Sequence, residues 1–272
     1  MAPLPPAEAG KEFPYWLVAA AALAVAAALF IAASDLYGQI FATVSRGIWI
    51  TIWVTVFGFA MASAIGLGVA LLALSKSRVL RQIARFYVEI IRGVPILVLL
   101  FWIAFAGVPA FVAAWNWLLG PLQASGWLDE LIVRDISLLW RAVIALTIGY
   151  SAFIAEVFRA GILSVETGQI EAAKALGLSG FQRFRLIVFP QAIRTILPPL
   201  GNDFVAMVKD SSLVSVLGVA DITQMGKIYA SGSFRFFETY SIVAYIYLIL
   251  TVSLSLMLRA LERRLRKSRT EP

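Results

Sequence analysis

Long apolar stretches are the feature that most constrains this chain. A helix needs about 20 mostly apolar residues to cross a hydrocarbon core of about 30 Å. Hydrophobic residues make up 61% of the sequence and charged residues 14%, whereas soluble domains are about half apolar and a quarter charged. We therefore predict an all-α integral membrane protein. The six predicted spans are Trp16–Ala33, Gly47–Leu74, Phe86–Ala106, Leu138–Arg159, Leu186–Val208 and Tyr240–Leu258.

Basic residues gather in three segments, which indicate how the chain is oriented. They follow the second, fourth and sixth spans, and the net charge is +7. Cytoplasmic loops are enriched in Lys and Arg, so this charge indicates topology rather than nucleic-acid binding. Both termini are then cytoplasmic, and residues 107–137 and 210–238 face the other side. The tryptophan-containing segment Trp115–Ile136 is expected to form an interfacial hairpin or short helix.

The N-terminal region leaves one alternative open. Residues 1–10 are rich in Pro and Ala and are expected to be disordered. The first apolar stretch resembles a signal peptide in position, but Lys11 before it is accompanied by Glu8 and Glu12, so no positive leader exists. We favour a retained helix.

Histidine and cysteine are both absent, and this excludes several chemistries. Disulfide frameworks, thiolate metal sites, His-ligated zinc and Ser–His catalysis all need one of these residues. No catalytic residue and no metal site are expected in this chain. The Walker pattern of a nucleotide-binding loop is also missing from the sequence.

The segment between the fourth and fifth spans has a pattern of its own. A strong helix former begins at Glu171, whose carboxylate suits a helix start, and Gly177 and Gly180 are expected to break the helix. Apolar residues at helical spacing follow, and Pro190 suits a first helical turn or a kink. These features predict a short surface helix, a turn and a second helix entering the membrane. A solvated loop that happens to be helical is the plainer interpretation.

This segment resembles the EAA loop of type I ABC importer permeases. The pattern consists of Glu-Ala-Ala, Gly, Ile and Pro at fixed spacing, here Glu171, Ala172, Ala173, Gly177, Ile187 and Pro190. Three further segments, 87–95, 155–162 and 209–218, resemble the polar amino acid branch of that family. The resemblance covers residues 46–264 and implies the type I importer transmembrane fold, with five core helices and one extra N-terminal helix. The domains expected are 1–15 (disordered), 16–45 (extra helix and loop), 46–264 (permease) and 265–272 (basic tail).

The resemblance also implies partners and a location. Two permease chains, identical or related, work with two ABC ATPase subunits, which bind the ATP and Mg²⁺, and a solute-binding protein delivers an amino acid. The chain itself needs no cofactor and lies in a bacterial inner membrane. The coupling helix that docks on the ATPase is implied at Glu171, Ala172, Ala173, Leu176, Gly177 and Gly180. Glu171 either pairs with a basic group of the ATPase or caps its own helix.

Charged residues inside apolar spans are costly and are therefore functional candidates. Glu89 with Arg92, and Glu156 with Arg159, are spaced to form ion pairs along one helix, and we favour a structural role over gating. Arg141 is expected at the membrane interface. A polar cluster lies in and just after the fifth span. Its residues are candidates for the translocation pathway, and the alternative is a polar helix end, where such residues are common. That cluster is Asn202, Asp203, Lys209, Asp210 and Ser211.

The second span is rich in small residues and is expected to pack closely against another span or a second permease chain. Two other classes of protein remain as alternatives to the importer permease. An ion-gradient-driven secondary transporter often has inverted repeats and mid-membrane charges, and neither is evident here. A membrane scaffold has no need of an L-shaped cytoplasmic element. Dependence on a separate ATPase discriminates between these classes.

Overall fold

The computed structural model describes residues 15–267 and the side chains of residues 15–262. Within this part every regular element is helical, which confirms the all-α prediction. The predicted disorder of residues 1–10 and the end of the tail, 268–272, lie outside the described residues. The α-helices are α1 (Tyr15–Ala33), α2 (Asp35–Val44), α3 (Ile48–Ala73), α4 (Arg78–Gly93), α5 (Ile96–Trp102), α6 (Val108–Ala124), α7 (Leu138–Leu163), α8 (Thr167–Ala175), α9 (Gly180–Arg183), α10 (Phe189–Asp210), α11 (Ile222–Ser233) and α12 (Phe236–Lys267).

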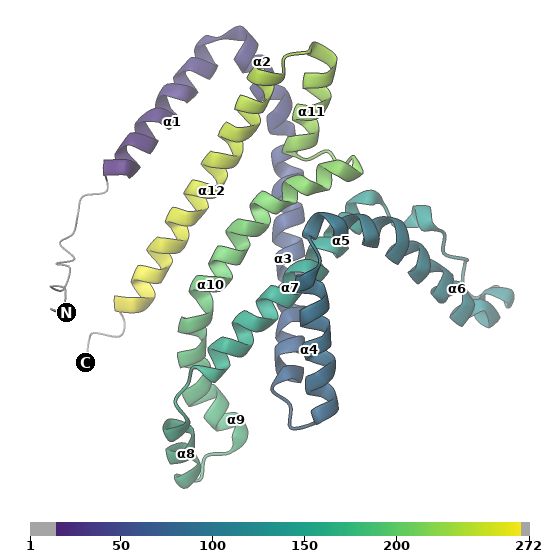
Figure 1. Cartoon of the computed structure of the whole chain (residues 1–272), viewed down its shortest axis with the longest axis vertical. Coiled ribbons are helices and arrows are strands. Elements are labelled where there is room, and N and C mark those ends of the chain that lie inside the picture. Colours follow the sequence, from purple (N-terminus) through teal and green to yellow (C-terminus); the bar gives the residue numbers. More distant parts are fainter. Residues whose placement is uncertain (1–14, 268–272) are drawn as a thin grey trace, which may run out of the picture.

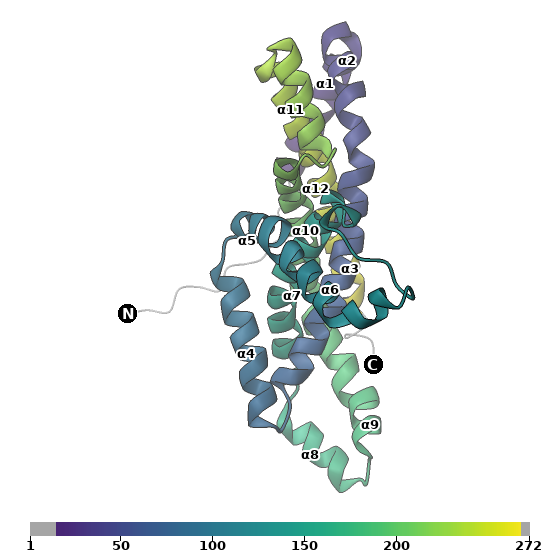
Figure 2. The same cartoon turned by 90° about the vertical axis from the view of Figure 1, so that its right-hand side faces the viewer.

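The long helices run along one axis, and the short helices gather at its two ends (Figures 1 and 2). α8 and α9 lie at one end, which we call the hairpin end, together with the turn between α3 and α4. α2 and α11 lie at the opposite end. α5 and α6 extend sideways from the middle of the bundle in Figure 1. The two ends therefore differ in which loops they expose.

Five helical segments of the described chain are long and apolar enough to cross a membrane. They are Tyr15–Ala33, Asp35–Ala73, Ile96–Ala124, Leu138–Leu163 and Phe236–Glu262. The first, second, fourth and sixth predicted spans fall within them or overlap them. The fifth corresponds to α10, which is long enough but is not among the five. Since α10 packs against α7 and α12, polar side chains on it do not all have to meet lipid.

The third predicted span is wrong. The helix that contains Phe86 ends at Gly93, and Val94 is extended with φ −102° and ψ 131°. Pro95 explains the break, because a proline disfavours helical backbone at the preceding residue. The apolar span runs instead from Ile96 through a π-helical segment (Ile103–Gly107) to Ala124. An interfacial hairpin or short helix was expected at 115–136, and the first part of this segment, up to Ala124, belongs instead to α6.

The small residues of the second span pack against α7 of the same chain. Gly58, Ala62 and Gly66 are buried, and a Cβ on Gly66 would lie 2.9 Å from the backbone oxygen of Ser151 on α7. Gly68, two residues further on, faces open space. One face of α3 is therefore committed to α7, and the other face remains available to lipid or to another protein.

Arg141 is buried by the protein near the start of α7, and its position at the membrane interface stays a prediction. It is 8% exposed. Its guanidinium donates hydrogen bonds to the carbonyl oxygens of Ile136 (2.9 Å) and Ala104 (3.1 Å), and to that of Val133. Ala104 lies in the π-helical segment between α5 and α6. Arg141 thus ties the start of α7 to the irregular part of the neighbouring span.

The additional N-terminal helix lies against α12. The Tyr245 hydroxyl donates to the carbonyl oxygen of Ala24 at 3.2 Å, and the Arg259 guanidinium lies 5.5 Å from the ring centroid of Trp16. No residue of α1 is buried in this chain. α1 is therefore held at its edge and leaves most of its surface to the surrounding bilayer or a partner.

Candidate functional site: a coupling hairpin and a charged helix bundle

α8 and α9 form a hairpin whose turn is specified by local hydrogen bonds. The N–H of Leu178 donates to the carbonyl of Ala173 at 3.1 Å, and the N–H of Gly177 donates to that of Lys174 at 2.9 Å. This is the Schellman arrangement, which needs a left-handed residue just past the helix end. Gly177 provides it with φ +77°. The prediction that Gly177 ends the helix is confirmed.

A capping box starts the second arm of the hairpin. The Ser179 hydroxyl accepts from the N–H of Gln182 at 3.3 Å, and the Gln182 side chain accepts from the N–H of Ser179 at 2.8 Å. Gly180 is the first residue of α9. The helix continues through a π-helical segment (Phe184–Val188), and Pro190 lies in the first turn of α10. The predicted L-shaped element is therefore present, with a rigid turn between its arms.

One of the two roles considered for Glu171, capping its own helix, is wrong. α8 begins at Thr167, so Glu171 lies in mid-helix and cannot cap the helix start. Ala173 is buried against the rest of the hairpin, whereas Ala172 is exposed. The segment before Glu171 includes Gly168, a poor helix former that hides the true start of the helix. Of the Glu-Ala-Ala triplet, Glu171 and Ala172 are available to another protein.

The tip of the hairpin exposes large apolar side chains. Leu176 is 80% exposed and Phe181 is 71% exposed. Phe184, Leu186 and Phe189 are also exposed along the second arm. Apolar patches of this kind mark interaction sites when they lie in water. The hairpin thus has the surface of a docking element for a protein partner.

The hairpin is braced against α7 and α10. The Gln191 side chain donates to the Gln169 side chain at 2.6 Å, which joins α10 to α8. Val165, Val188 and Ile196 are buried in one hydrophobic cluster, with Ile187 half-buried nearby in sequence. Because packed interiors do not deform continuously, a displacement of this hairpin displaces the helix ends to which it is packed.

The five polar pathway candidates on and after α10 separate onto different faces. Asp203 and Asp210, seven residues apart, lie on one side of the helix and are half-buried, and Asp210 accepts a hydrogen bond from the Tyr150 hydroxyl at 2.7 Å. Asn202 and Lys209, also seven apart, are exposed. Ser211 is fully buried and donates to the carbonyl of Val208 at 2.7 Å. The structure groups the two aspartates with α7, and it places Ser211 in the core.

The two Glu-x-x-Arg segments behave differently. Glu156 and Arg159 form an ion pair, with Arg159 Nη2 at 2.7 Å from Glu156 Oε2 and two further hydrogen bonds between the same side chains. Among the described residues no ion pair joins Glu89 to Arg92. Arg92 instead lies over the Phe153 ring of α7, 5.4 Å from its centroid. The predicted pairing is confirmed for the first segment and wrong for the second.

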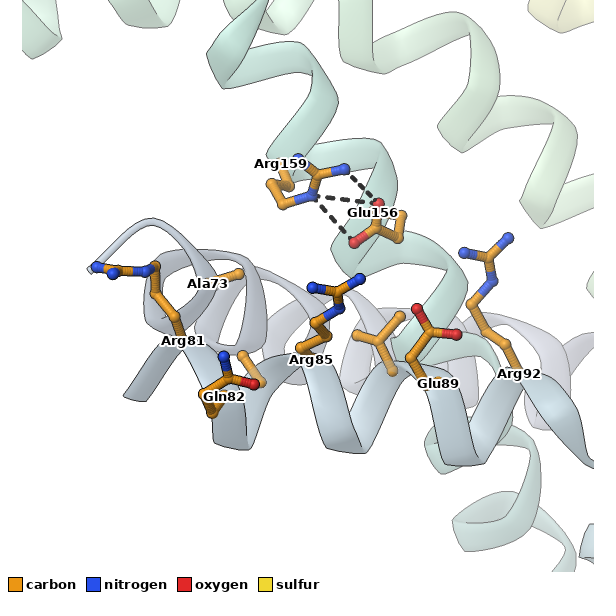
Figure 3. A pocket seen from close by; sticks show the side chains of 10 residues that line it. Ala73, Arg81, Gln82, Arg85, Glu89, Arg92, Glu156 and Arg159 are labelled. Atoms are coloured by element: carbon orange, nitrogen blue, oxygen red, sulfur yellow. Dashed lines mark hydrogen bonds and ion pairs between the residues drawn. The ribbon is translucent and has the colours of Figure 1, made fainter. Parts of the chain in front are cut away.

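These charges line a cavity of about 430 Å³ between α3, α4 and α7. Figure 3 shows that Arg85, Glu89 and Arg92 project from α4 towards Glu156 and Arg159 of α7. The Arg81 side chain points away and donates to the carbonyls of Ser75 and Lys76 in the α3–α4 turn. The helix bundle therefore has an open, mostly basic cavity on the side of the hairpin end.

The family model for binding-protein-dependent transport system inner membrane components matches residues 62–267. The chain belongs to this family of permeases. The probable amino-acid permease protein YxeN of Bacillus subtilis is 35% identical over 84% of this chain and 93% of its own length. The glutamine transport system permease protein GlnP of Escherichia coli is 37% identical over 81% of this chain and 92% of its own. The crystal structure of an amino acid ABC transporter with histidines contains a chain with a TM-score of 0.67 and 36% identity, covering 84% of this chain and 95% of its own.

Family membership confirms the ABC permease interpretation over the ion-driven transporter and the scaffold. It also confirms the type I importer fold. The matched region includes the hairpin and both Glu-x-x-Arg segments. The predicted domain boundaries, including an added segment before residue 46, stay predictions.

Sequence reasoning missed two buried polar residues of the permease. Tyr150 on α7 contacts Asp210 across two helices, and nothing in its neighbourhood in sequence signals that contact. Asp221 is fully buried at the start of α11, where it accepts from the N–H of Gln224 at 2.8 Å and from the Tyr247 hydroxyl at 3.1 Å. Burial raises the pKa of the Asp221 carboxyl. An Asp directly before an apolar helical segment is the sequence pattern that indicates this N-cap.

Proposed function

We propose that this permease is the membrane subunit of an importer for polar amino acids that is driven by a separate ABC ATPase. The rigid hairpin with exposed Leu176 and Phe181 at its tip is the observation that carries the proposal. An exposed apolar tip on a rigid turn is suited to bind in a groove of a protein partner. A displacement of the hairpin on binding is then transmitted to α7 and α10. The relatives named as amino-acid and glutamine permeases support the substrate class.

Other subunits complete the proposed importer. ATP and Mg²⁺ bind to the ATPase, which agrees with the missing Walker pattern in this sequence. A second permease chain, the same or related, completes the channel, and a solute-binding protein delivers the amino acid from outside. The hairpin end faces the cytoplasm, because the basic α3–α4 turn and the hairpin lie there together. Both termini are then cytoplasmic.

The translocation pathway in this proposal follows the polar face of α10. Asp203 and Asp210 would attract the ammonium group of an amino acid, and Lys209 would attract its carboxylate. Asn202 would add neutral hydrogen bonds. Ser211 is left out of the pathway, because its hydroxyl is already bonded inside the core. Selection among amino acids would fall largely to the binding protein.

The test is gentle affinity purification of the chain from its native membrane, with identification of co-purifying proteins by mass spectrometry. A Gly177→Arg variant runs alongside, since a side chain at φ +77° is strained by about 1–2 kcal/mol and the arginine would crowd the docking surface. Gly177→Asn is the matched control, because Asn tolerates left-handed backbone. We expect an ATPase with the parent and with Gly177→Asn and none with Gly177→Arg.

The opposite results are equally informative. An ATPase that co-purifies undiminished with Gly177→Arg would refute the coupling hairpin. The complete absence of an ATPase under conditions that preserve complexes would refute the importer, and ion-gradient-driven uptake would then be tested next. The co-purifying proteins also show whether the second permease chain is identical to this one.

A further inference from the structure

Three faces of α4 carry three different kinds of side chain. Ala84 and Val88 are buried against the bundle. Arg85 and Glu89 line the cavity of about 430 Å³ and project towards α7 (Figure 3). The third face carries large apolar side chains that are between 51% and 69% exposed, at a spacing of four, three and four residues that places them on one side of the helix. We call this face the α4 stripe, and it consists of Val79, Ile83, Phe86 and Ile90.

Two cations lie next to the stripe, where α4 begins. Lys76 belongs to the α3–α4 turn and Arg78 is the first residue of α4, and both are exposed. Among the described residues neither of them forms an ion pair. Arg81, one turn further on, is committed to the carbonyl oxygens of Ser75 and Lys76 in the turn. The start of α4 therefore presents two uncommitted positive charges.

The length of the stripe matches one leaflet of a bilayer. α4 starts at the hairpin end and runs towards the middle of the bundle beside α3 (Figures 1 and 2). From Val79 to Ile90 the helix rises about 16 Å, and half of a hydrocarbon core of about 30 Å is about 15 Å. α4 is also not among the five segments that are long and apolar enough to cross a membrane. Such a helix reaches through one leaflet, with Lys76 and Arg78 at the level of the headgroups.

Charge and symmetry distinguish the possible occupants of this surface. An anionic phospholipid supplies acyl chains to the stripe and a phosphate to the two cations, and a guanidinium suits a phosphate well. A second identical chain packed through the same stripe would bring Lys76 and Arg78 against their own copies, and like charges repel. The ATPase has a different apolar surface at the tip of the hairpin, where Leu176 and Phe181 are exposed. The combination of stripe and cations therefore favours lipid.

We propose that the α4 stripe lies among the acyl chains of the cytoplasmic leaflet, and that Lys76 and Arg78 bind the phosphate of an anionic phospholipid there. Of the proposed function, this lipid site needs only the cytoplasmic location of the hairpin end. The charged face of α4 stays turned towards the cavity and α7, so the helix separates the lipid from the cavity. The site has no part in recognising the transported amino acid.

The absence of cysteine allows a single fluorescent probe to be placed on either side of α4. Bimane is attached at Ile83→Cys, in the stripe, and at Gln82→Cys, the neighbouring position that lines the cavity. The full-length permease, with the proteins that co-purify with it, is reconstituted into bilayers of phosphatidylcholine and phosphatidylglycerol. One of the two lipids carries bromine on its acyl chains. Bromine quenches bimane at short range, so quenching reports which lipid lies against each position.

We expect brominated lipid to quench the probe at Ile83→Cys strongly and the probe at Gln82→Cys weakly. At Ile83→Cys, phosphatidylglycerol should be preferred over phosphatidylcholine by about fivefold for each cation. Arg78→Gln should lower this preference by about fivefold, and adding Lys76→Gln should abolish it. Quenching by brominated phosphatidylcholine should persist in both variants, which shows that α4 still lies in the membrane. Arg134→Gln, an equal change of charge between α6 and α7, should leave the preference unchanged.

Three results would overturn this lipid site. An unquenched probe at Ile83→Cys would mean that protein covers the stripe, and crosslinking from the same cysteine would then identify a second permease chain or the ATPase. Equal quenching by the two lipids would show that anionic headgroups are not selected. A preference that survives the loss of Lys76 and Arg78 would place the selection elsewhere. Failure of the proposed importer is seen separately, as an ATPase that does not co-purify, and it changes none of the quenching measurements.

Discussion

The tip of the hairpin and the cavity beside α4 expose opposite kinds of side chain. The hairpin exposes Leu176 and Phe181 at an end of the bundle that carries basic loops. The cavity is lined by Arg85 and Glu89, which are exposed and make no ion pair among the described residues. Large apolar side chains in water favour a covering surface, whereas exposed charges are solvated. The comparison teaches that the apolar tip, and not the charged cavity, has the surface of a protein-docking site.

The largest expected effect concerns the hairpin tip. Phe181→Asp together with Leu176→Asp places two charges in a site that should be desolvated on docking. Truncation of such anchors costs about 2–4 kcal/mol, so the dissociation constant for the ATPase should rise by about 30-fold or more. Binding of the purified ATPase to the detergent-solubilised permease measures it.

A control for the hairpin variant uses an exposed aromatic far from the hairpin. Trp117 on α6 is 83% exposed, and Trp117→Asp should leave ATPase affinity unchanged. Equal loss of ATPase binding in the Trp117 variant would mean that general damage, and not docking, explains the result.

The second effect tests the close packing of α3 on α7. A Cβ at Gly66 meets the Ser151 carbonyl oxygen at 2.9 Å, so Gly66→Ala should lower the stability of the α3–α7 pair by about 1–3 kcal/mol. Gly68→Ala on the same helix meets open space and should raise stability by about 0.5–1 kcal/mol. Thermal unfolding of the two purified variants compares them. Equal midpoints would contradict the close packing of α3 on α7.

The third effect concerns the ion pair that lines the cavity beside α4. Glu156→Gln releases Arg159, and both side chains are about one-third exposed, so stability should change by less than about 1 kcal/mol. The cavity gains positive charge, so import of glutamate relative to arginine should increase by up to about fivefold. Arg159→Gln should shift the ratio in the opposite direction. A shift of the same sign in both variants would show that charge in this cavity does not act on the transported amino acid.

The smallest effect is expected where the hairpin joins α10. Gln169→Ala removes one exposed hydrogen bond to Gln191, worth about 0.5–1.5 kcal/mol. A double-mutant cycle with Gln191→Ala should return a coupling energy near the lower end of that range. ATPase affinity should stay within about twofold, since one brace among several packed residues is lost. A tenfold loss of ATPase affinity would show that this hydrogen bond contributes to docking itself.

Local sequence predicted the hairpin well and contacts between distant helices poorly. The helix ends at Gly177 through hydrogen bonds from the N–H of Gly177 to Lys174 and from the N–H of Leu178 to Ala173, so a few neighbouring residues contain the whole cause. The start of α8 was missed because Gly168, a poor helix former, lies inside the helix. The burial of Arg141 was not predicted, because one of its carbonyl partners, Ala104, lies 37 residues away.

The two Glu-x-x-Arg segments show the limit most clearly. Both have the spacing that permits an ion pair, and only Glu156–Arg159 forms one. Arg92 is one residue from the end of α4 and meets Phe153 of α7 instead. The spacing predicts which side chains can form an ion pair. Whether the pair forms depends on competing partners from other helices.

By itself the sequence determined that this chain is helical, membrane-spanning and equipped with a hairpin before α10, because span length, glycine conformation and helix capping act over a few residues. Only the tertiary structure decided that α4 and α5 are separate, that Asp210 meets Tyr150, and which charges remain unpaired around Arg92. Those outcomes depend on distances between helices that are far apart in the chain, and no local pattern records them.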